Sequence, residues 1–187
     1  MNTLGITGSN GYIGKNLVKR CSKHNINFNT LSKKKNIKQN NFLFKEIDLL
    51  PENFFKDSDI IVHLAGIAHN ENISNLDYFR KINVNFAINI GQLCIKHKIK
   101  KLIFISSIKA LYQENYYGKT KFEAELELTK LFKNCQHTEL VIIRPGLIYG
   151  NSPKGNLKLI KIFLKFRFIP ILSNKNNKIS MMHVDDL

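Results

Sequence analysis

The sequence predicts an α/β fold in which a doubly wound parallel sheet carries helices on both faces. Three observations lead to this prediction: β-rich runs alternate with helical stretches, several runs are continuously apolar, and a glycine-rich turn joins the first run to the first helix. Continuous apolar runs such as residues 60–62 and 102–105 are typical of strands buried on both faces. We expect strands over residues 3–7, 27–31, 42–47, 60–64, 101–106 and 139–144.

Helices are expected over residues 12–24, 76–98 and 117–133. In the last, apolar residues at helical spacing predict an inward face that includes Phe122, Leu126 and residues 128–132. The same pattern places Glu123, Glu125 and Glu127 on the outward face. Near residue 151 the composition changes, which indicates that a second region begins there.

Composition and charge exclude several classes of protein. The values of 43% apolar and 23% charged residues fit a soluble globular chain rather than a fibrous or disordered one. The net charge is +15, but only 4 of the 29 basic residues are arginine and the lysines are scattered. This distribution favours a solvated basic surface over a nucleic-acid-binding surface.

Neither a membrane-spanning run nor a signal peptide is recognised, so we expect no integral membrane segment. The three cysteines are widely separated, which argues against a disulfide framework or a bound metal and predicts a cytoplasmic protein.

The turn after the first expected strand carries glycines in a G-x-x-G-x-x-G spacing. Glycine permits a tight turn, close approach of the backbone to a pyrophosphate, and close packing of the helix on the strand. The N–H groups and the positive dipole end of the helix then face the phosphates. We therefore predict a Rossmann-like dinucleotide-binding domain over residues 1–150, the alternative being a glycine-rich turn without a ligand. The cofactor-binding residues expected in this turn are Gly8, Asn10, Gly11, Tyr12, Ile13 and Gly14.

The ends of the next two strands bear on the identity of the dinucleotide. The second strand ends at Ser32 and Lys33, where a site that prefers NAD usually carries an acid for the ribose 2′-hydroxyl. A hydroxyl followed by a cation favours a 2′-phosphate, so we expect NADP slightly more than NAD. Asp48, with Leu49, follows the third strand and can accept a hydrogen bond from the adenine amino group. Alternatively, Asp48 is the N-cap of a helix that begins near Pro51.

A hydroxyl, a phenol and an ammonium form the candidate catalytic group. Ser107 follows the fifth expected strand, and the Tyr-x-x-x-Lys spacing places Tyr117 and Lys121 on one helical face, one turn apart. An ammonium beside the phenol would lower the Tyr117 pKa from about 10 to about 7, and Ser107 would hold the same oxygen. Such a phenol can act as a general base on a hydroxyl or as a general acid on a ketone. The alternative is that Tyr117 and Lys121 are simply a pair on the surface of the helix, because this spacing is common by chance.

Together these motifs resemble the extended short-chain dehydrogenase/reductase superfamily, in its NAD-dependent epimerase/dehydratase branch. The segment around Ser107 is most similar to bacterial UDP-sugar 4-epimerases and 4-keto-reductases of surface-polysaccharide pathways. The resemblance covers nearly the whole chain and keeps the family's order. The matching segments are residues 7–14, 48–49, 63–66, 83–84, 106–107, 117–121 and 144–150.

The resemblance implies a nucleotide-sugar substrate, with hydride transfer at the sugar C4 and Tyr117 as the acid/base. Ser107, Tyr117 and Lys121 would be catalytic, and Tyr117 and Lys121 would also contact the cofactor. Residues assigned to the cofactor cleft by the same resemblance are Leu64, Ala65, Gly66 and Pro145, the last near the nicotinamide. A homodimer through the helices over residues 76–98 and 117–133 is implied as well.

Other family positions refine this picture. Asn83 would hold the long helix against the sheet, and His63 is expected to be a core histidine with satisfied hydrogen bonds. Ile108 and Lys109 occupy positions where a 4,6-dehydratase carries an acid/base pair, so dehydration is disfavoured.

Two departures from the family pattern affect the substrate region. The segment between Ser107 and Tyr117 is shorter than usual, and family chains continue well past the sequence that ends at Leu187. We therefore expect residues 151–187 to be an incomplete substrate-binding region.

Two alternative functions remain: a truncated dinucleotide-binding relative without catalysis, acting as a sensor or scaffold, and a peripheral membrane module. The second rests on Lys158, Lys161 and Lys165, which lie on one face of an apolar helical pattern.

Overall fold

A computed structural model describes residues 2–34, 40–68, 75–150, 165 and 180–187. The chain forms two compact units, Met1–Arg144 and Pro145–Leu187. In the second unit, strands β7 (Leu147–Tyr149) and β8 (Met181–His183) pair in parallel. The expected basic amphipathic helix lies outside the described residues, apart from Lys165. No helix in the described part of the chain is long and apolar enough to cross a membrane.

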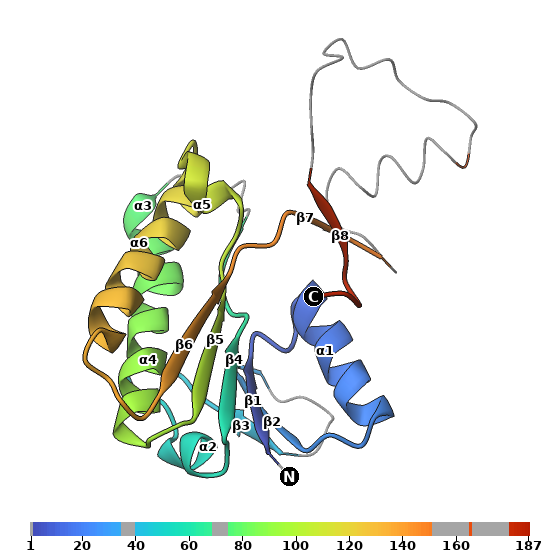
Figure 1. Cartoon of the computed structure of the whole chain (residues 1–187), viewed down its shortest axis with the longest axis vertical. Coiled ribbons are helices and arrows are strands. Elements are labelled where there is room, and N and C mark those ends of the chain that lie inside the picture. The colour runs from blue at the N-terminus through green and yellow to red at the C-terminus, as the bar shows by residue number, and fades with distance from the viewer. Residues whose placement is uncertain (1, 35–39, 69–74, 151–164, 166–179) are drawn as a thin grey trace. The chain divides into compact units, whose positions relative to one another are not determined.

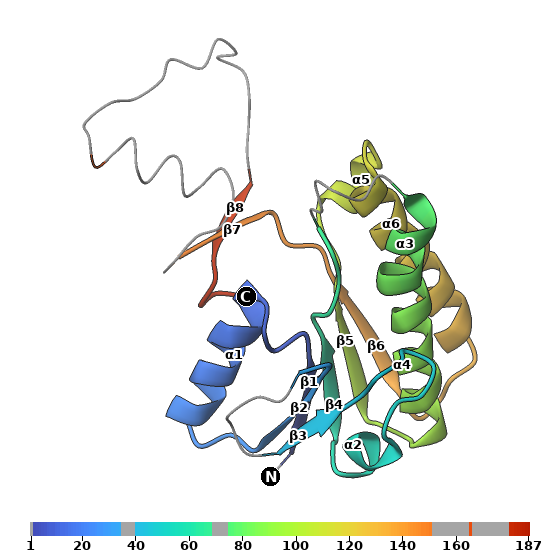
Figure 2. The same cartoon turned by 180° about the vertical axis from the view of Figure 1, so that it is seen from behind.

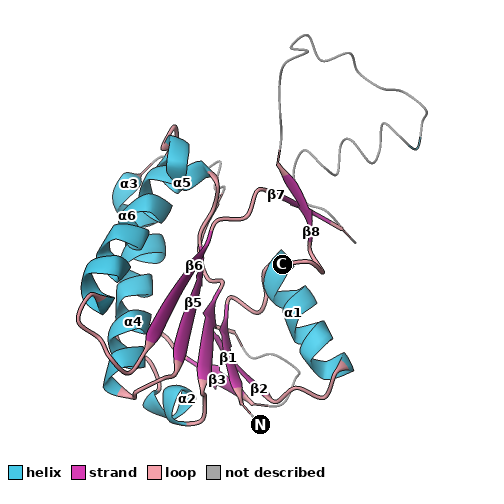
Figure 3. Ribbon diagram, in the orientation of Figure 1, coloured by secondary structure: helices cyan, strands magenta, loops and turns pink. Residues whose placement is uncertain are grey.

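The first unit is built on a parallel sheet in the order β3-β2-β1-β4-β5-β6 (Figure 3). The strands are β1 (Leu4–Thr7), β2 (Phe28–Ser32), β3 (Asn41–Leu43), β4 (Ile60–His63), β5 (Lys101–Ile105) and β6 (Glu139–Ile143). The chain runs outward from β1 in one direction and from β4 in the other, so the strand order reverses between these two neighbours. In doubly wound sheets, ligands bind at this reversal, outside the carboxyl ends of the strands. The predicted fold class is confirmed, and a ligand site is expected at the carboxyl ends of β1 and β4.

Helices cover both faces of this sheet (Figures 1 and 2). Helix α1 (Tyr12–Lys23) lies on one face, and α4 (Phe86–Lys96) packs beside α6 (Tyr116–Phe132) on the other. Shorter helices are α2 (Glu52–Lys56), α3 (Leu76–Arg80) and α5 (Lys109–Tyr112). The main core lies between the sheet and α4 and α6, and its most deeply buried side chains include Phe54, Phe55, Ile61, Ile90, Leu102, Phe104 and Leu128.

Two expected elements differ from the structure. The third strand ends at Leu43 rather than at residue 47, because Phe44 and Ile47 reach the core from a turn instead of a strand. The expected helix over residues 76–98 is interrupted by a π-helical turn, η1 (Lys81–Asn85), between α3 and α4. Such turns insert an extra residue and often occur at functional sites.

The buried face of α6 also differs from the prediction. Glu125 is 3% exposed although it was expected to point outward, whereas Leu126 is 45% exposed although it was expected to point inward. Lys121 and Glu125 therefore share the buried face with Ala124 and Leu128. The prediction was wrong because it assumed that every glutamate of this helix faces water.

Candidate active site

The glycine turn between β1 and α1 is closed by contacts that exclude side chains. Gly8 has φ +70°, and a Cβ there would lie 2.6 Å from the backbone nitrogen of Ala65. A Cβ on Gly14 would lie 2.7 Å from the Cα of Ser9, inside the turn itself. At Gly11 the nearest atom to a Cβ is the Gly8 oxygen, at 3.2 Å. The turn therefore requires glycine at positions 8 and 14 far more strictly than at position 11.

The amino end of α1 is shaped to face an anion. Its N-cap is Gly11, which has no side chain to accept from the first helical N–H groups. Asn10 and Gly11 are exposed, and Tyr12 and Ile13 are half-buried beside them. Because the cradle is formed by backbone and would be filled by side chains at Gly8 and Gly14, these residues fit the pyrophosphate of a dinucleotide.

The loop after β4 lies against this turn. The hydroxyl of Thr7 is 2.8 Å from Nδ1 of His63 and accepts from the N–H of Ala65 at 3.3 Å. These contacts hold residues 64–66 next to the glycine turn, where they were predicted. His63 is fully buried and lies against the rings of Phe86 and Phe104. It is a core residue as expected, but its Nε2 has no hydrogen-bond partner in the described structure, so the expectation of full satisfaction was wrong.

Asn83 fastens the same loop from the helical side. Its amide oxygen accepts from the N–H of Ile67 at 2.9 Å, and its amide nitrogen donates to the Ile67 carbonyl at 3.1 Å. The amide nitrogen also lies 3.0 Å from the hydroxyl of Thr120 on α6. The side chain thus joins the π-helical turn, the loop after β4 and α6. The predicted structural role was correct in kind, and the loop is an additional partner.

Ser107 and Tyr117 meet where β5 ends and α6 begins. The side chain of Asn115 caps α6 by accepting from the N–H of Gly118 at 2.9 Å, and this fixes the first helical turn. The Ser107 side chain lies close enough to the Tyr117 phenol to act on its pKa. Tyr116 points elsewhere, since it is 40% exposed and its ring lies against Phe79. The structure thus brings the predicted serine and the predicted tyrosine together.

The expected pKa of Tyr117 was wrong. Burial raises the pKa of Tyr117 above its usual value, and the nearby Ser107 side chain opposes this rise only in part. The ammonium of Lys121 lies 4.0 Å above the ring of Phe104, where a cation–π contact replaces water. Burial lowers the pKa of Lys121 to about 7, and the carboxylate of Glu125 opposes that change. Lys121 is therefore only partly charged at neutral pH, which the sequence did not indicate.

Glu125 and Arg144 were not predicted as site residues. The buried carboxylate of Glu125 accepts from Nε and Nη2 of Arg144, which follows β6. The spacing of four residues between Lys121 and Glu125 was a usable signal, because it places both side chains on one helical face.

The remaining predicted residues lie at other strand ends. The hydroxyl of Ser32 donates to the carbonyl of Lys34 at 2.6 Å, and Lys33 is exposed. Asp48 accepts from the amide of Asn89 at 2.9 Å, and Leu49 is exposed. Helix α2 has Pro51 as its N-cap, so the alternative role of Asp48 as a cap is wrong. Pro145 is the first residue of the second unit.

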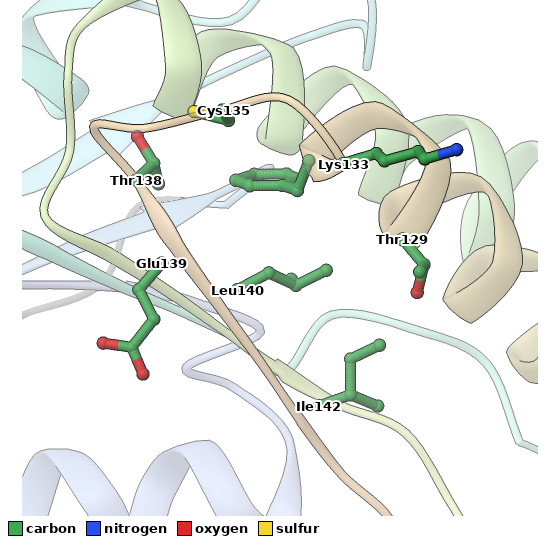
Figure 4. A pocket seen from close by; sticks show the side chains of 8 residues that line it. Thr129, Lys133, Cys135, Thr138, Glu139, Leu140 and Ile142 are labelled. Atoms are coloured by element: carbon green, nitrogen blue, oxygen red, sulfur yellow. The ribbon is translucent and has the colours of Figure 1, made fainter.

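Two open grooves of the first unit lie away from this site. One, of about 510 Å³, is formed by the end of α6 and the beginning of β6. Figure 4 shows Thr129 and Lys133 on the helical side and Thr138 and Glu139 on the strand side. The other, of about 440 Å³, lies among Thr3, Asn27, Asn40 and their neighbours. Both are at amino ends of strands, the edge opposite to the glycine turn, so neither is part of the candidate active site.

Comparisons with known proteins show the family of this chain and support its fold. Residues 4–187 match the "NAD dependent epimerase/dehydratase family". The chain is 30% identical to the UDP-glucose 4-epimerase of Vibrio cholerae over 210 residues, which cover 97% of this chain but 64% of that protein. Among solved structures, the UDP-N-acetylglucosamine 4-epimerase of Bacillus cereus has a TM-score of 0.84 at 16% identity, covering 100% of this chain and 70% of its own. The UDP-glucuronic acid 4-epimerase of the same organism, solved with UDP-glucuronic acid and NAD, has a TM-score of 0.78 at 20% identity, covering 98% and 70%.

Proposed function

Because the chain belongs to the NAD-dependent epimerase/dehydratase family, we propose that it transfers hydride at C4 of a nucleotide sugar, with Tyr117 as the acid/base. The reaction is either a 4-epimerisation or a 4-keto-reduction. The observation that carries this proposal is the proximity of Ser107 to the Tyr117 phenol, one helical turn before Lys121, at the sheet edge that also holds the glycine turn. The names of the similar proteins support a UDP-sugar as the substrate class.

A bound nicotinamide dinucleotide would supply the group that accepts and returns hydride. The backbone of residues 8–14 would hold its pyrophosphate, and residues 64–66 would line its cleft. Tyr117 holds its proton at neutral pH, because burial raises its pKa. It is therefore set to donate that proton to a 4-keto oxygen, while Ser107 holds the same oxygen by a hydrogen bond. For the opposite direction Tyr117 must first lose its own proton, and the resulting phenolate then accepts the 4-hydroxyl proton; the charge of Lys121 favours the phenolate.

The cofactor is proposed to be NADP slightly more than NAD. Ser32 already uses its hydroxyl within the protein, and the described end of β2 presents Lys33 and Lys34 to solvent without a carboxylate. Two exposed cations suit the extra phosphate of NADP. Fluorescence titration with NADH and NADPH measures this difference, and Lys33→Glu combined with Lys34→Glu should weaken NADPH binding more than NADH binding. Equal weakening of both would contradict the assignment.

A homodimer through the α3–α4 segment and α6 remains part of the proposal. Leu126 on α6 is 45% exposed, which suits a helix face that packs on a second copy. Light scattering of the purified chain measures its mass, and a monomer at all concentrations would contradict the proposal.

Turnover of a UDP-sugar with each cofactor tests the function. Nicotinamide absorbance follows hydride transfer, and NMR of the sugar reports the configuration at C4. Tyr117→Phe should lower kcat by roughly 100- to 10 000-fold, since it removes the proton that the reaction moves. Tyr116→Phe is the matched control, because this neighbour is exposed and packs on Phe79. Dinucleotide binding without turnover would favour the non-catalytic alternative, and unchanged turnover in Tyr117→Phe would exclude the proposed acid/base.

A further inference from the structure

Two oppositely charged side chains are buried one helical turn apart on α6. Lys121 and Glu125 are each 3% exposed, on the face that packs against the sheet and α4. The Lys121 ammonium rests over Phe104 and makes no hydrogen bond within the described structure. A buried charge without hydrogen bonds is unfavourable unless an opposite charge lies nearby.

The carboxylate of Glu125 is fixed by a partner from a different strand. Nε of Arg144 lies 2.9 and 3.0 Å from its two oxygens, and Nη2 lies 2.5 Å from Oε2. This fork holds the plane of the carboxylate, so Glu125 cannot swing to form a direct ion pair with Lys121. The negative charge of Glu125 therefore acts on Lys121 through space, while the Lys121 ammonium stays over the ring of Phe104.

We propose that Glu125 is a positioning residue for Lys121: its carboxylate, held in place by Arg144, keeps the Lys121 ammonium charged within the buried site. The proposal rests on the proposed function, in which a charged Lys121 acts on Tyr117. It adds an acid and an arginine, neither of which contacts the reacting phenol, to the residues on which the chemistry depends.

The other groups around Lys121 do not replace this charge. On α6, Tyr117 is protonated and neutral at pH 7. From β4, His63 is neutral, because burial and the charge of Lys121 lower its pKa to about 3. From the π-helical turn, Asn83 is uncharged, and from the end of β6, Arg144 is positive. Glu125 is therefore the acid that faces Lys121 in the described structure, and it opposes the lowering of the Lys121 pKa by burial.

Direct titration of Lys121 by NMR of isotope-labelled lysine side chains tests the proposal. The Lys121 signal is assigned by its disappearance in Lys121→Arg. In Glu125→Gln the Lys121 pKa should fall by roughly one unit, a tenfold loss in the ratio of charged to neutral amine. Glu127→Gln is the matched control, because it removes the same charge from a half-buried position of the same helix, where Glu127 pairs with Lys130 near the surface. A shift in Glu125→Gln no larger than in Glu127→Gln would overturn the proposal.

Two further variants separate charge from packing. Glu125→Asp keeps the charge while shortening the side chain, so its Lys121 pKa should stay closer to the wild-type value than that of Glu125→Gln. Arg144→Gln releases the carboxylate, which can then pair with Lys121, so the Lys121 pKa should rise. A fall of the Lys121 pKa in Arg144→Gln would contradict the role given to the fork, even if Glu125→Gln did not fold.

This titration needs neither dinucleotide nor sugar, so its outcome is independent of the proposed function. If the wild-type chain turns over a UDP-sugar, the alkaline limb of its kcat profile should move to lower pH in Glu125→Gln by the same shift. If no turnover occurs while the Lys121 pKa still falls, the proposed function fails and the electrostatic role of Glu125 stands.

Discussion

The glycine turn and the beginning of α6 form two halves of the candidate active site, and they are fixed by different physics. The turn is defined by space: Gly8 and Gly14 are needed because backbone atoms lie where a Cβ would be. The α6 half is defined by charge and burial: Lys121 and Glu125 are enclosed, and Arg144 from another element forms an ion pair with Glu125. The first half therefore depends on close backbone approach, within the turn at Gly14 and to Ala65 at Gly8, whereas the second depends on side chains from α6 and from the end of β6.

The largest loss of stability and of dinucleotide affinity is expected where the turn is most crowded. Gly14→Ala places a methyl group 2.7 Å from the Ser9 Cα, so the turn must open. We expect a loss of about 3 kcal/mol in the free energy of unfolding and a loss of at least about 100-fold in dinucleotide affinity. Gly11→Ala is the matched control and should cost about 1 kcal/mol or less. Denaturant unfolding measures the stability of each variant, and titration measures its dinucleotide affinity. Equal effects at the two positions would show that steric crowding does not determine the structure of the glycine turn.

The next effect belongs to the charged half. Lys121→Met removes a buried amine whose pKa is about 7, against roughly 10.4 in an unfolded chain. Between these pH values the unfolded chain binds a proton that the native chain releases, so the free energy of unfolding of the wild type rises with pH from about 7 to about 10. Lys121→Met should abolish that rise. It should be more stable than the wild type by on the order of 5 kcal/mol below pH 7, with the difference vanishing above about pH 10.5.

Lys119→Met is the control for this pH dependence, because Lys119 is exposed on the same helix and should not alter the slope. Urea unfolding at a series of pH values gives the measurement. A Lys121→Met variant with the pH slope of the wild type would show that the amine is not held in a depressed state, and the contrast between the two halves would disappear.

The fold was predicted from the sequence more completely than the candidate site, because local patterns report strands and turns but not which side chains become buried. The glycine spacing, the six strands and the pairing of Ser107 with Tyr117 follow from local patterns and strand order. Glu125 could not be predicted as buried, because its partner Arg144 is 19 residues away, beyond β6. The direction of the Tyr117 pKa was missed for a related reason, since spacing reports which residues are neighbours on a helix and not how completely packing excludes water.

A smaller effect is expected at the side chain that joins the loop after β4 to α6. Asn83→Ala removes the hydrogen bonds with the Ile67 N–H and carbonyl and with Thr120. We expect a loss of roughly 2 to 3 kcal/mol in the free energy of unfolding, because these groups are buried or half-buried. Asn85→Ala lies in the same π-helical turn but is exposed, so it should change stability by about 0.5 kcal/mol or less. Similar losses in the two variants would assign the effect to the helical turn rather than to the side-chain contacts.

The smallest effect tests whether the two halves are independent. Thr7, at the start of the glycine turn, accepts from the Ala65 N–H, and Asn83 holds Ile67, so one short loop is fastened from both sides. In a double-mutant cycle of Thr7→Val and Asn83→Ala, either change releases the same segment, and the second then loses less than it would alone. We therefore expect a coupling free energy of about 0.5 to 1 kcal/mol. Strictly additive changes in the free energy of unfolding would mean that the loop does not couple the two halves. The glycine turn and the α6 half would then be stabilised independently.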